Sequence, residues 1–515
     1  MKAHLMYRDR DFDLHGSPLP HEAELTQDLE LCMLFEAMAA GDDFLLEVAQ
    51  KAVLTSIGEP EAILYRQHVL ADCLDHSAIV REMYAIAVEA LRRERGVWSA
   101  LAPRYPEGVL YQSVELLQRF LDLLKRLRRI TDAHGGHFKS EGFAKLFGMF
   151  AKELDDQYLR IFEDHLRRLE FRDGVLTSAE LDKGNKGTRY ILHPQRVSQS
   201  WTERLTGWIN EQLSTDRSGY VYEIDDRDES GFTALAEIRN RGIGVVARAL
   251  AQSTDHILDF FSMLRLELGF YVGCLNLHDR LAKKGEPTCF PTPLASGKAM
   301  LSARALYDPC LSLSMEQRAV GNDLNADNKL LVMMAGASRG GKSTLLRAIG
   351  LAQLMMQCGM FVSAQSLHAN VCNAVFTHFK REEDAGMRSG KLDEERSRMS
   401  SIVDNLSPNS IVLCNESFAS TNEREGSEIA RQIVRALLET GIKVFYVTHL
   451  FDLAQGFHRA KMQSALFLRA ERLADGRRTF RLVESEPLPT SYAQDLYRRI
   501  FGTAHVRRRT VVPRV

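Results

Sequence analysis

The stretch that decides the fold of the second half of this chain is Gly336-Ala337-Ser338-Arg339-Gly340-Gly341-Lys342-Ser343-Thr344. It follows the apolar run 330–335 and leads into residues 344–357, which are apolar enough to form a buried helix. The spacing of its glycines, lysine and serine fits G-x-x-x-x-G-K-[ST], in which backbone N–H groups and a helix N-terminus hold the phosphates of a nucleotide. The sequence therefore predicts a strand, a phosphate-binding turn and a helix.

This loop predicts a site for a nucleotide and Mg²⁺. We expect Lys342 to reach the β and γ phosphates and Ser343 to ligate the metal ion. The residues expected to surround the phosphates are Gly336, Ala337, Ser338, Arg339, Gly340, Gly341, Lys342, Ser343 and Thr344. The alternative is a glycine-rich strand-to-helix turn with an incidental lysine.

Composition places the chain among ordinary globular proteins. Its 515 residues are too many for one core, and 26% are charged and 45% apolar. The net charge of −2 argues neither for nor against a nucleic-acid partner. Because the eight cysteines contain no C-x-x-C pair and residues 1–20 contain no apolar run, we expect reduced thiols, a cytoplasmic location and no membrane span.

The first half carries a helical period. A long helix is predicted from the stripe Leu110, Val114, Leu117, Leu121 and Leu124, and its basic side is either solvated or in contact with phosphate. A second long helix is predicted over 143–171, and a third over 232–282 with an interruption around Gly242 and Gly244. Between them, residues 172–231 are rich in turns and contain β-rich pieces at 188–192 and 219–224, which predict an insertion of hairpins.

Polar residues follow two apolar strands of the second half. The predicted strand 411–414 ends in Asn415-Glu416, and the predicted strand 443–448 ends next to His449. Glu416 is expected to act as general base through one water, and Asn415 to serve the metal ion where such enzymes usually carry Asp. An amide brings an oxygen without the charge, so we expect weaker metal binding and slow hydrolysis. A capping acid and a structural histidine are the alternatives.

Together these motifs resemble the MutS family of DNA mismatch-repair ATPases, within the wider ABC class. The resemblance is carried by Gly336 to Thr344, residues 359–365, Asn415-Glu416, Gly426 and Thr448-His449, and more weakly by residues 63–74 and 304–309. It implies that Lys342 and Ser343 contact phosphate and Mg²⁺, that Glu416 activates water and that His449 senses the γ-phosphate. It also implies a homodimer in which Ser389 of one subunit completes the partner's ATP site.

The chain also departs from the family pattern. Ala337, Ser338 and Arg339 replace Pro-Asn-Met in the loop, and Ser417-Phe418-Ala419 stands in place of a glycine-arginine-rich turn. The short segment before residue 21 leaves no room for the mismatch-reading and connector domains, so we expect a short form of the family. The arginine-rich end is either a phosphate-binding or a solvated tail.

The sequence thus predicts a multidomain protein with an all-α core or lever domain, a small β-rich insertion and an α/β P-loop ATPase domain of the ABC type. We expect an N-terminal tail (1–20), the helical domain (21–295) with a clamp-like insertion (172–231), the ATPase domain (296–502) and a basic tail (503–515). The predicted function is an ATPase that drives a dimeric clamp on duplex, mismatched or branched DNA in mismatch repair or recombination. The alternative is a weakly hydrolysing ATP-binding clamp on another nucleic acid, such as ribosomal RNA.

Overall fold

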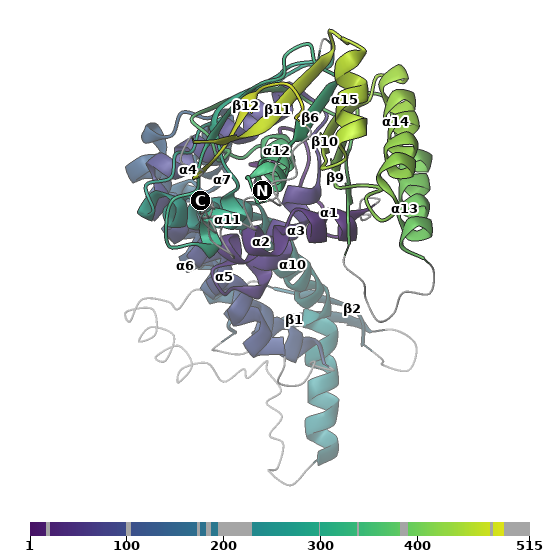
Figure 1. Ribbon diagram of the computed structural model, residues 1–515. Helices are drawn as coiled ribbons and strands as arrows, with labels where there is room; N and C mark the ends of the chain where they lie inside the picture. The colour runs from purple at the N-terminus through teal and green to yellow at the C-terminus, as the bar shows by residue number, and fades with distance from the viewer. Residues whose placement is uncertain are drawn as a thin grey trace, which may run out of the picture. The chain divides into compact units, whose positions relative to one another are not determined.

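The computed structural model describes residues 1–16, 21–98, 105–171, 176–181, 187–193, 229–297, 299–336, 339–381, 390–473 and 477–488 (Figure 1). The chain divides into two compact units. Unit 1 comprises residues 1–5, 9–12 and 76–268, and unit 2 comprises residues 6–8, 13–75 and 269–515. Within the described ranges, none of the helices has the length and apolar character needed to cross a membrane. The domain boundaries drawn from the sequence stay predictions.

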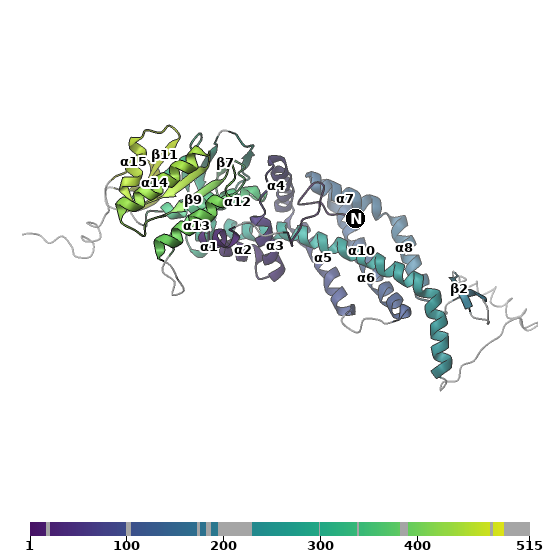
Figure 2. The same cartoon turned by 90° about the vertical axis from the view of Figure 1, so that its right-hand side faces the viewer.

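Unit 1 is made of long helices and one small hairpin (Figure 2). Its helices are α5 (Ser77–Trp98), α6 (Pro106–His134), η1 (Gly135–His137), α7 (Glu141–Glu153), α8 (Asp156–Leu169) and the first part of α10 (Glu229–Lys283). The hairpin pairs β1 (Thr177–Leu181) with β2 (Gly187–Leu192) in antiparallel fashion. The β-rich piece at 188–192 is therefore confirmed, whereas the piece at 219–224 lies outside the described residues.

Helix α6 buries the predicted leucine stripe, which confirms this long helix. Four of its basic side chains are paired with carboxylates of the same unit: Arg119, Lys125, Arg126 and Arg128. Lys125 Nζ lies 2.7 Å from Glu163 Oε2, and Arg126 Nη1 lies 2.6 Å from Glu89 Oε2. Both basic side chains are also partly exposed, so the choice between a solvated and a phosphate-binding side stays a prediction.

The predicted helix over 143–171 is wrong, because the structure has two helices there. Helix α7 ends at Glu153, and α8 begins after Asp155, whose carboxylate accepts the Tyr158 N–H at 2.6 Å. A side-chain oxygen at the N-cap satisfies a backbone donor that has no partner within the helix. The apolar period continues across the break, which is why spacing alone did not reveal it.

The predicted interruption around Gly242 and Gly244 is also wrong, because α10 is continuous through both glycines. A glycine inside a helix costs about 1 kcal/mol relative to alanine. Ile243 and Ala247 are buried against Leu110 of α6. We infer that burial of this apolar face offsets the low helix propensity.

Unit 2 combines helices with two mixed sheets. Its N-terminal helices are α1 (Glu22–Asp28), α2 (Leu31–Ala39), α3 (Asp43–Leu54) and α4 (Pro60–Asp75). The guanidinium of Arg66 on α4 is fully buried and donates to the carbonyls of Met6 and Cys358 at 2.8 and 3.1 Å. Residues 13–75 therefore pack with the second half of the chain.

The larger sheet has six strands in the order β12-β11-β6-β10-β9-β8. The strands are β6 (Leu331–Ala335), β8 (Val375–Phe379), β9 (Ile411–Asn415), β10 (Lys443–Val447), β11 (Ala465–Arg472) and β12 (Arg478–Glu484). All pairs are parallel except β11 with β12. The strands predicted at 330–335, 411–414 and 443–448 are confirmed with ends shifted by one residue at most.

The second sheet has the order β3-β7-β4-β5. Its elements are β3 (Thr292–Leu294), β4 (Leu301–Leu306), β5 (Asn322–Asn325) and β7 (Ser366–Asn370), and the short helix α11 (Pro309–Ser314) follows β4. Asn322 of β5 donates to the Phe480 carbonyl at 3.3 Å and accepts the Leu482 N–H at 2.7 Å. One asparagine thus joins the two sheets.

Helices cover both faces of the six-stranded sheet (Figure 1). The helices are α12 (Lys342–Gln357), α13 (Lys391–Asn405), α14 (Glu423–Glu439) and α15 (Phe451–Arg459). Val412 of β9 shares a core with buried side chains of α13, α14 and α15. Its neighbour Leu413 faces the other way, and a Cβ added to Gly350 of α12 would lie 2.6 Å from Leu413 Cδ1. The close approach of α12 therefore needs a glycine at this position.

Candidate active site

The predicted phosphate loop joins β6 to α12. Gly336 and Gly341 have φ angles of 111° and 91°, which favour glycine. A Cβ at Gly341 would also lie 2.9 Å from the Phe480 carbonyl oxygen. Gly340 is buried, Thr344 lies in the first turn of α12, and the exposed Arg339 has a φ of 59°. Ala337 and Ser338 lie outside the described residues.

Lys342 is the first residue of α12, and it is buried. Its ammonium donates to the carbonyl of Gly336 at 2.9 Å, which ties the two ends of the loop together. Burial lowers the pKa of Lys342, the carboxylate of Glu416 acts in the opposite direction, and the charge of Arg478 lowers the pKa further. A nearby anion stabilises the charged form of a desolvated cation more strongly than that of a solvated one.

The hydroxyl of Ser343 donates to Oδ1 of Asn415 at 2.9 Å. Asn415 is the last residue of β9, and its carbonyl accepts the Lys380 N–H at 2.9 Å. Hydroxyl and amide oxygens are the hard ligands that Mg²⁺ takes, usually one or two from protein with the rest from water and phosphate. The residues present therefore fit Mg²⁺, although the described part of the chain holds no cluster of three His, Cys, Asp or Glu suited to a metal ion.

Glu416 lies beside His449. Oε2 of Glu416 is 3.7 Å from Nδ1 of His449, and the two side chains are 34% and 46% exposed, so solvent reaches both. The imidazole of His449 is the main cause that lowers the pKa of Glu416, and burial opposes it. The carboxylate is therefore ionised at neutral pH.

Strand order brings these groups together. β6, β10 and β9 are adjacent and parallel, with Met334 paired to Val447 and Val447 paired to Asn415. Side chains that follow these strands meet at one edge of the sheet, as ligand-binding residues do in open α/β sheets. Lys342, Ser343, Asn415, Glu416 and His449 lie at this edge. Ser389 lies outside the described residues.

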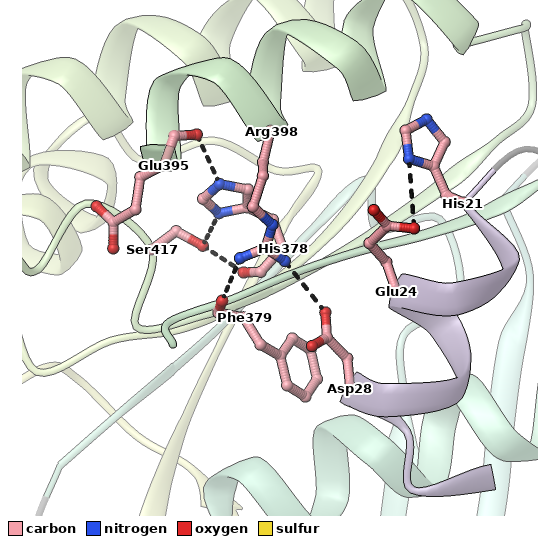
Figure 3. Close-up of polar contacts among 8 residues, drawn as sticks. All are labelled: His21, Glu24, Asp28, His378, Phe379, Glu395, Arg398 and Ser417. Atoms are coloured by element: carbon pink, nitrogen blue, oxygen red, sulfur yellow. Dashed lines mark hydrogen bonds and ion pairs between the residues drawn. The ribbon is translucent and has the colours of Figure 1, made fainter. Parts of the chain in front are cut away.

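Two residues near this edge were not predicted from the sequence. Arg478 of β12 lies near enough to Lys342 to lower its pKa. His378 of β8 is fully buried and contacts Ser417, the residue after Glu416 (Figure 3). A single histidine or arginine within an ordinary strand carries no spacing signal. The phosphate loop and the polar residues at the strand ends could be predicted, because each is recognised from a few consecutive residues.

Two family models match this chain. The model of the MutS2 N-terminal domain matches residues 58–284, and the model of MutS domain V matches residues 332–499. The second match contains every described residue of the candidate site from Gly336 to His449. The first match covers mainly helices, and the second contains the six-stranded sheet except Leu331 of β6.

Curated relatives are similar over part of their length. The DNA mismatch repair protein MutS of Parabacteroides distasonis is 25% identical over 344 residues, which are 61% of this chain and 38% of that protein. The Endonuclease MutS2 of Lacticaseibacillus casei is 28% identical over 286 residues, which are 54% of this chain and 34% of that protein. The DNA mismatch repair protein MutS of Thermotoga sp. strain RQ2 is 37% identical over 141 residues, 27% of this chain and 18% of that protein. The chain thus spans about a third of the length of the first two relatives.

Proposed function

Because this chain belongs to the MutS family, we propose that it is an ATP-dependent DNA-binding protein of mismatch repair or recombination. Its second half is proposed to be a P-loop ATPase of the ABC type. ATP binding and hydrolysis would drive a dimeric clamp on duplex, mismatched or branched DNA. The observation that carries the ATPase proposal is the meeting of Lys342, the Ser343–Asn415 pair and the Glu416–His449 pair at one sheet edge.

The loop residues would bind the phosphates of ATP. The N-terminus of α12 offers backbone N–H groups, and Lys342 offers a cation whose burial has already lowered its pKa. Negative phosphate charge would compensate this buried cation and favour its charged form. The bond from Lys342 to Gly336 at 2.9 Å holds the loop in shape before any ligand arrives.

Ser343 and Asn415 would hold Mg²⁺ through their oxygens. When bound, Mg²⁺ neutralises charge on the β and γ phosphates. Asn415 brings no charge of its own, so the metal ion is expected to bind more weakly than beside a carboxylate. This argues for slow turnover.

Glu416 would orient and deprotonate the attacking water. The neighbouring His449 lowers the pKa of Glu416, so the carboxylate is ionised and able to accept a proton at neutral pH. His449 follows β10 and shares the edge with the loop, which suits a group that senses the γ-phosphate. In the dimer, Ser389 of the partner subunit is proposed to complete the site.

The similarity to two DNA mismatch repair proteins supports DNA over another nucleic acid. A binding panel tests the choice of partner. Homoduplex, mismatched, branched and single-stranded DNA and a structured RNA are compared with and without ATP. We expect ATP-dependent binding to one of the DNA substrates. Equal binding to every ligand with no effect of ATP would contradict the DNA proposal, and preference for RNA would replace it.

Steady-state hydrolysis tests the enzyme. Glu416→Gln keeps the shape of the side chain but removes the base, so we expect turnover to fall roughly 100-fold or more while ATP still binds. Glu439→Gln, which removes an exposed carboxylate at the end of α14, is the matched control. If Glu416→Gln hydrolyses ATP as fast as the parent, the proposed active site is wrong.

A further inference from the structure

The turn that carries Glu416 is strained. Glu416 and Phe418 have φ angles of 54° and 61°, in the left-handed region that residues other than glycine rarely adopt. Such backbone persists only where the surrounding structure holds it. The position of the Glu416 carboxylate therefore depends on what surrounds residues 416–418.

Strand β10 holds one side of the turn. The Glu416 N–H donates to the Val447 carbonyl at 2.9 Å, and the buried hydroxyl of Tyr446 donates to the Ser417 carbonyl at 2.7 Å. These bonds attach the backbone of the turn to the strand that leads to His449. The opposite side of the turn is in contact with β8.

His378 holds that other side (Figure 3). Oγ of Ser417 lies 2.7 Å from Nδ1 of His378 and 2.6 Å from the His378 carbonyl oxygen. The ring also stacks on Phe418, with centroids 5.3 Å apart and planes 20° from parallel. Both His378 and Ser417 are fully buried, so no water competes for these bonds.

The second ring nitrogen fixes the proton of the imidazole. Nε2 of His378 lies 2.9 Å from the Glu395 carbonyl, which only accepts, so Nε2 carries a hydrogen. Burial lowers the pKa of His378 to about 4, and the ring is neutral at pH 7. Nδ1 is then an acceptor, and the hydroxyl of Ser417 donates to it or to the His378 carbonyl.

Glu395 belongs to α13, so the same histidine attaches the turn to a helix. A second bond runs in parallel, because the Ser420 hydroxyl donates to Oε1 of Glu395 at 3.1 Å. Helix α13 begins at Lys391, two residues after Ser389. A movement of the first turn of α13 would therefore shift residues 416–418 through the contacts of His378.

We propose that His378 is a positioning residue for Glu416, holding its turn through Ser417 and tying that turn to α13. His378 is fully buried beneath the turn, so its effect is on the placement of the base. The inference rests on the proposed hydrolysis of ATP. In a dimer it would make the base of one subunit sensitive to contacts at the start of its own α13.

Two variants separate positioning from folding. His378→Phe keeps an aromatic ring on Phe418 but removes both hydrogen bonds, and Ser417→Ala removes one buried oxygen. We expect each to lower kcat roughly 10- to 100-fold, the range for a misplaced catalytic group, with KM for ATP within about twofold of the parent. Because both act on one contact, the double variant should be no slower than the slower single variant. His378→Asn keeps an acceptor near the Nδ1 position and should be faster than His378→Phe.

Turnover is measured per bound nucleotide, so that loss of folded protein does not count as loss of kcat. Val434→Ala, a truncation in the core on α14, should lower the melting temperature without lowering kcat. If His378→Phe does not fold, the kcat of Ser417→Ala alone tests whether the turn positions Glu416. If turnover in the parent depends on Glu416 but Ser417→Ala has an unchanged kcat, this inference is wrong. The proposed ATPase activity is then still supported. Turnover in the parent that does not depend on Glu416 overturns the proposed function and this inference with it.

Discussion

Asn415 is the residue that should limit metal binding. Its amide oxygen accepts from Ser343 at 2.9 Å, where a carboxylate would add a negative charge next to the same hydroxyl. In Asn415→Asp we expect the Mg²⁺ concentration that gives half-maximal hydrolysis to fall roughly tenfold, because the added charge attracts the cation. Asn415→Ala removes the oxygen and should raise that concentration. If neither variant changes the Mg²⁺ requirement, Asn415 does not serve the metal ion.

His378 should make the stability of unit 2 depend on pH. Its pKa of about 4 in the folded chain lies below the reference value of 6.5. Between these values the unfolded chain binds a proton that the folded chain does not, so stability falls as the pH drops from 6.5 towards 4. We expect the parent to lose about 2 kcal/mol more than His378→Phe between pH 7 and pH 5, measured by urea unfolding.

The matched control for this titration is His368→Phe, which replaces an exposed histidine on β7. It should show the same pH dependence as the parent. Equal losses in the parent and in His378→Phe would mean that the buried ring takes up its proton without cost, which contradicts the effect of burial.

Helix α13 is attached to α1 by an ion pair between Arg398, which is 13% exposed, and the buried Asp28 (Figure 3). Arg398 Nη2 lies 3.4 Å from Asp28 Oδ2, and Arg398 Nη1 donates to the Phe379 carbonyl at 2.8 Å. Burial raises the pKa of Asp28 and lowers that of Arg398. Each charge has therefore lost solvent, and the pair compensates part of that loss.

Removing one partner of this pair should be costly. We expect Arg398→Met to lower the free energy of unfolding by about 3 kcal/mol, because Asp28 is left charged in a buried place. Adding Asp28→Asn should recover part of this loss, although the bond to Phe379 stays lost. Urea unfolding of the parent, both single variants and the double variant gives the coupling. Strictly additive losses would show that Asp28 does not depend on Arg398.

The elements themselves could largely be predicted where their signals are local. The run 330–335, the loop glycines and the apolar segment after them indicated β6 and α12 almost to their ends. The break at Asp155 and the continuity of α10 past Gly242 were missed. At Asp155 an N-cap ends the apolar period of one helix and starts another, and in α10 a buried apolar face outweighs the low helix propensity of the glycines.

At the scale of the whole molecule, we expect nucleotide to control assembly. Glu416→Gln should bind Mg²⁺-ATP without hydrolysing it, so the proposed closed dimer would accumulate. Light scattering should then give twice the mass of the monomer, and removal of ATP should reverse it. Lys342→Ala, which loses the cation of the loop, should stay monomeric under the same conditions. A constant mass of Glu416→Gln with and without nucleotide would contradict an ATP-driven dimer.

The local elements and the candidate site residues of this protein could be predicted from the sequence alone. The spacing from Gly336 to Ser343 and the polar ends of two apolar strands predicted a phosphate loop, a base and a histidine, because each signal lies within a few residues of chain. The order of the strands is visible only in the folded chain: β10 lies beside β6 and β9 lies beside β10, which brings Glu416 and His449 to the edge that carries the loop. The folded chain also shows that His378 is buried and that Arg398 pairs with the buried Asp28, since burial and pairing follow from the packing of segments far apart in the sequence.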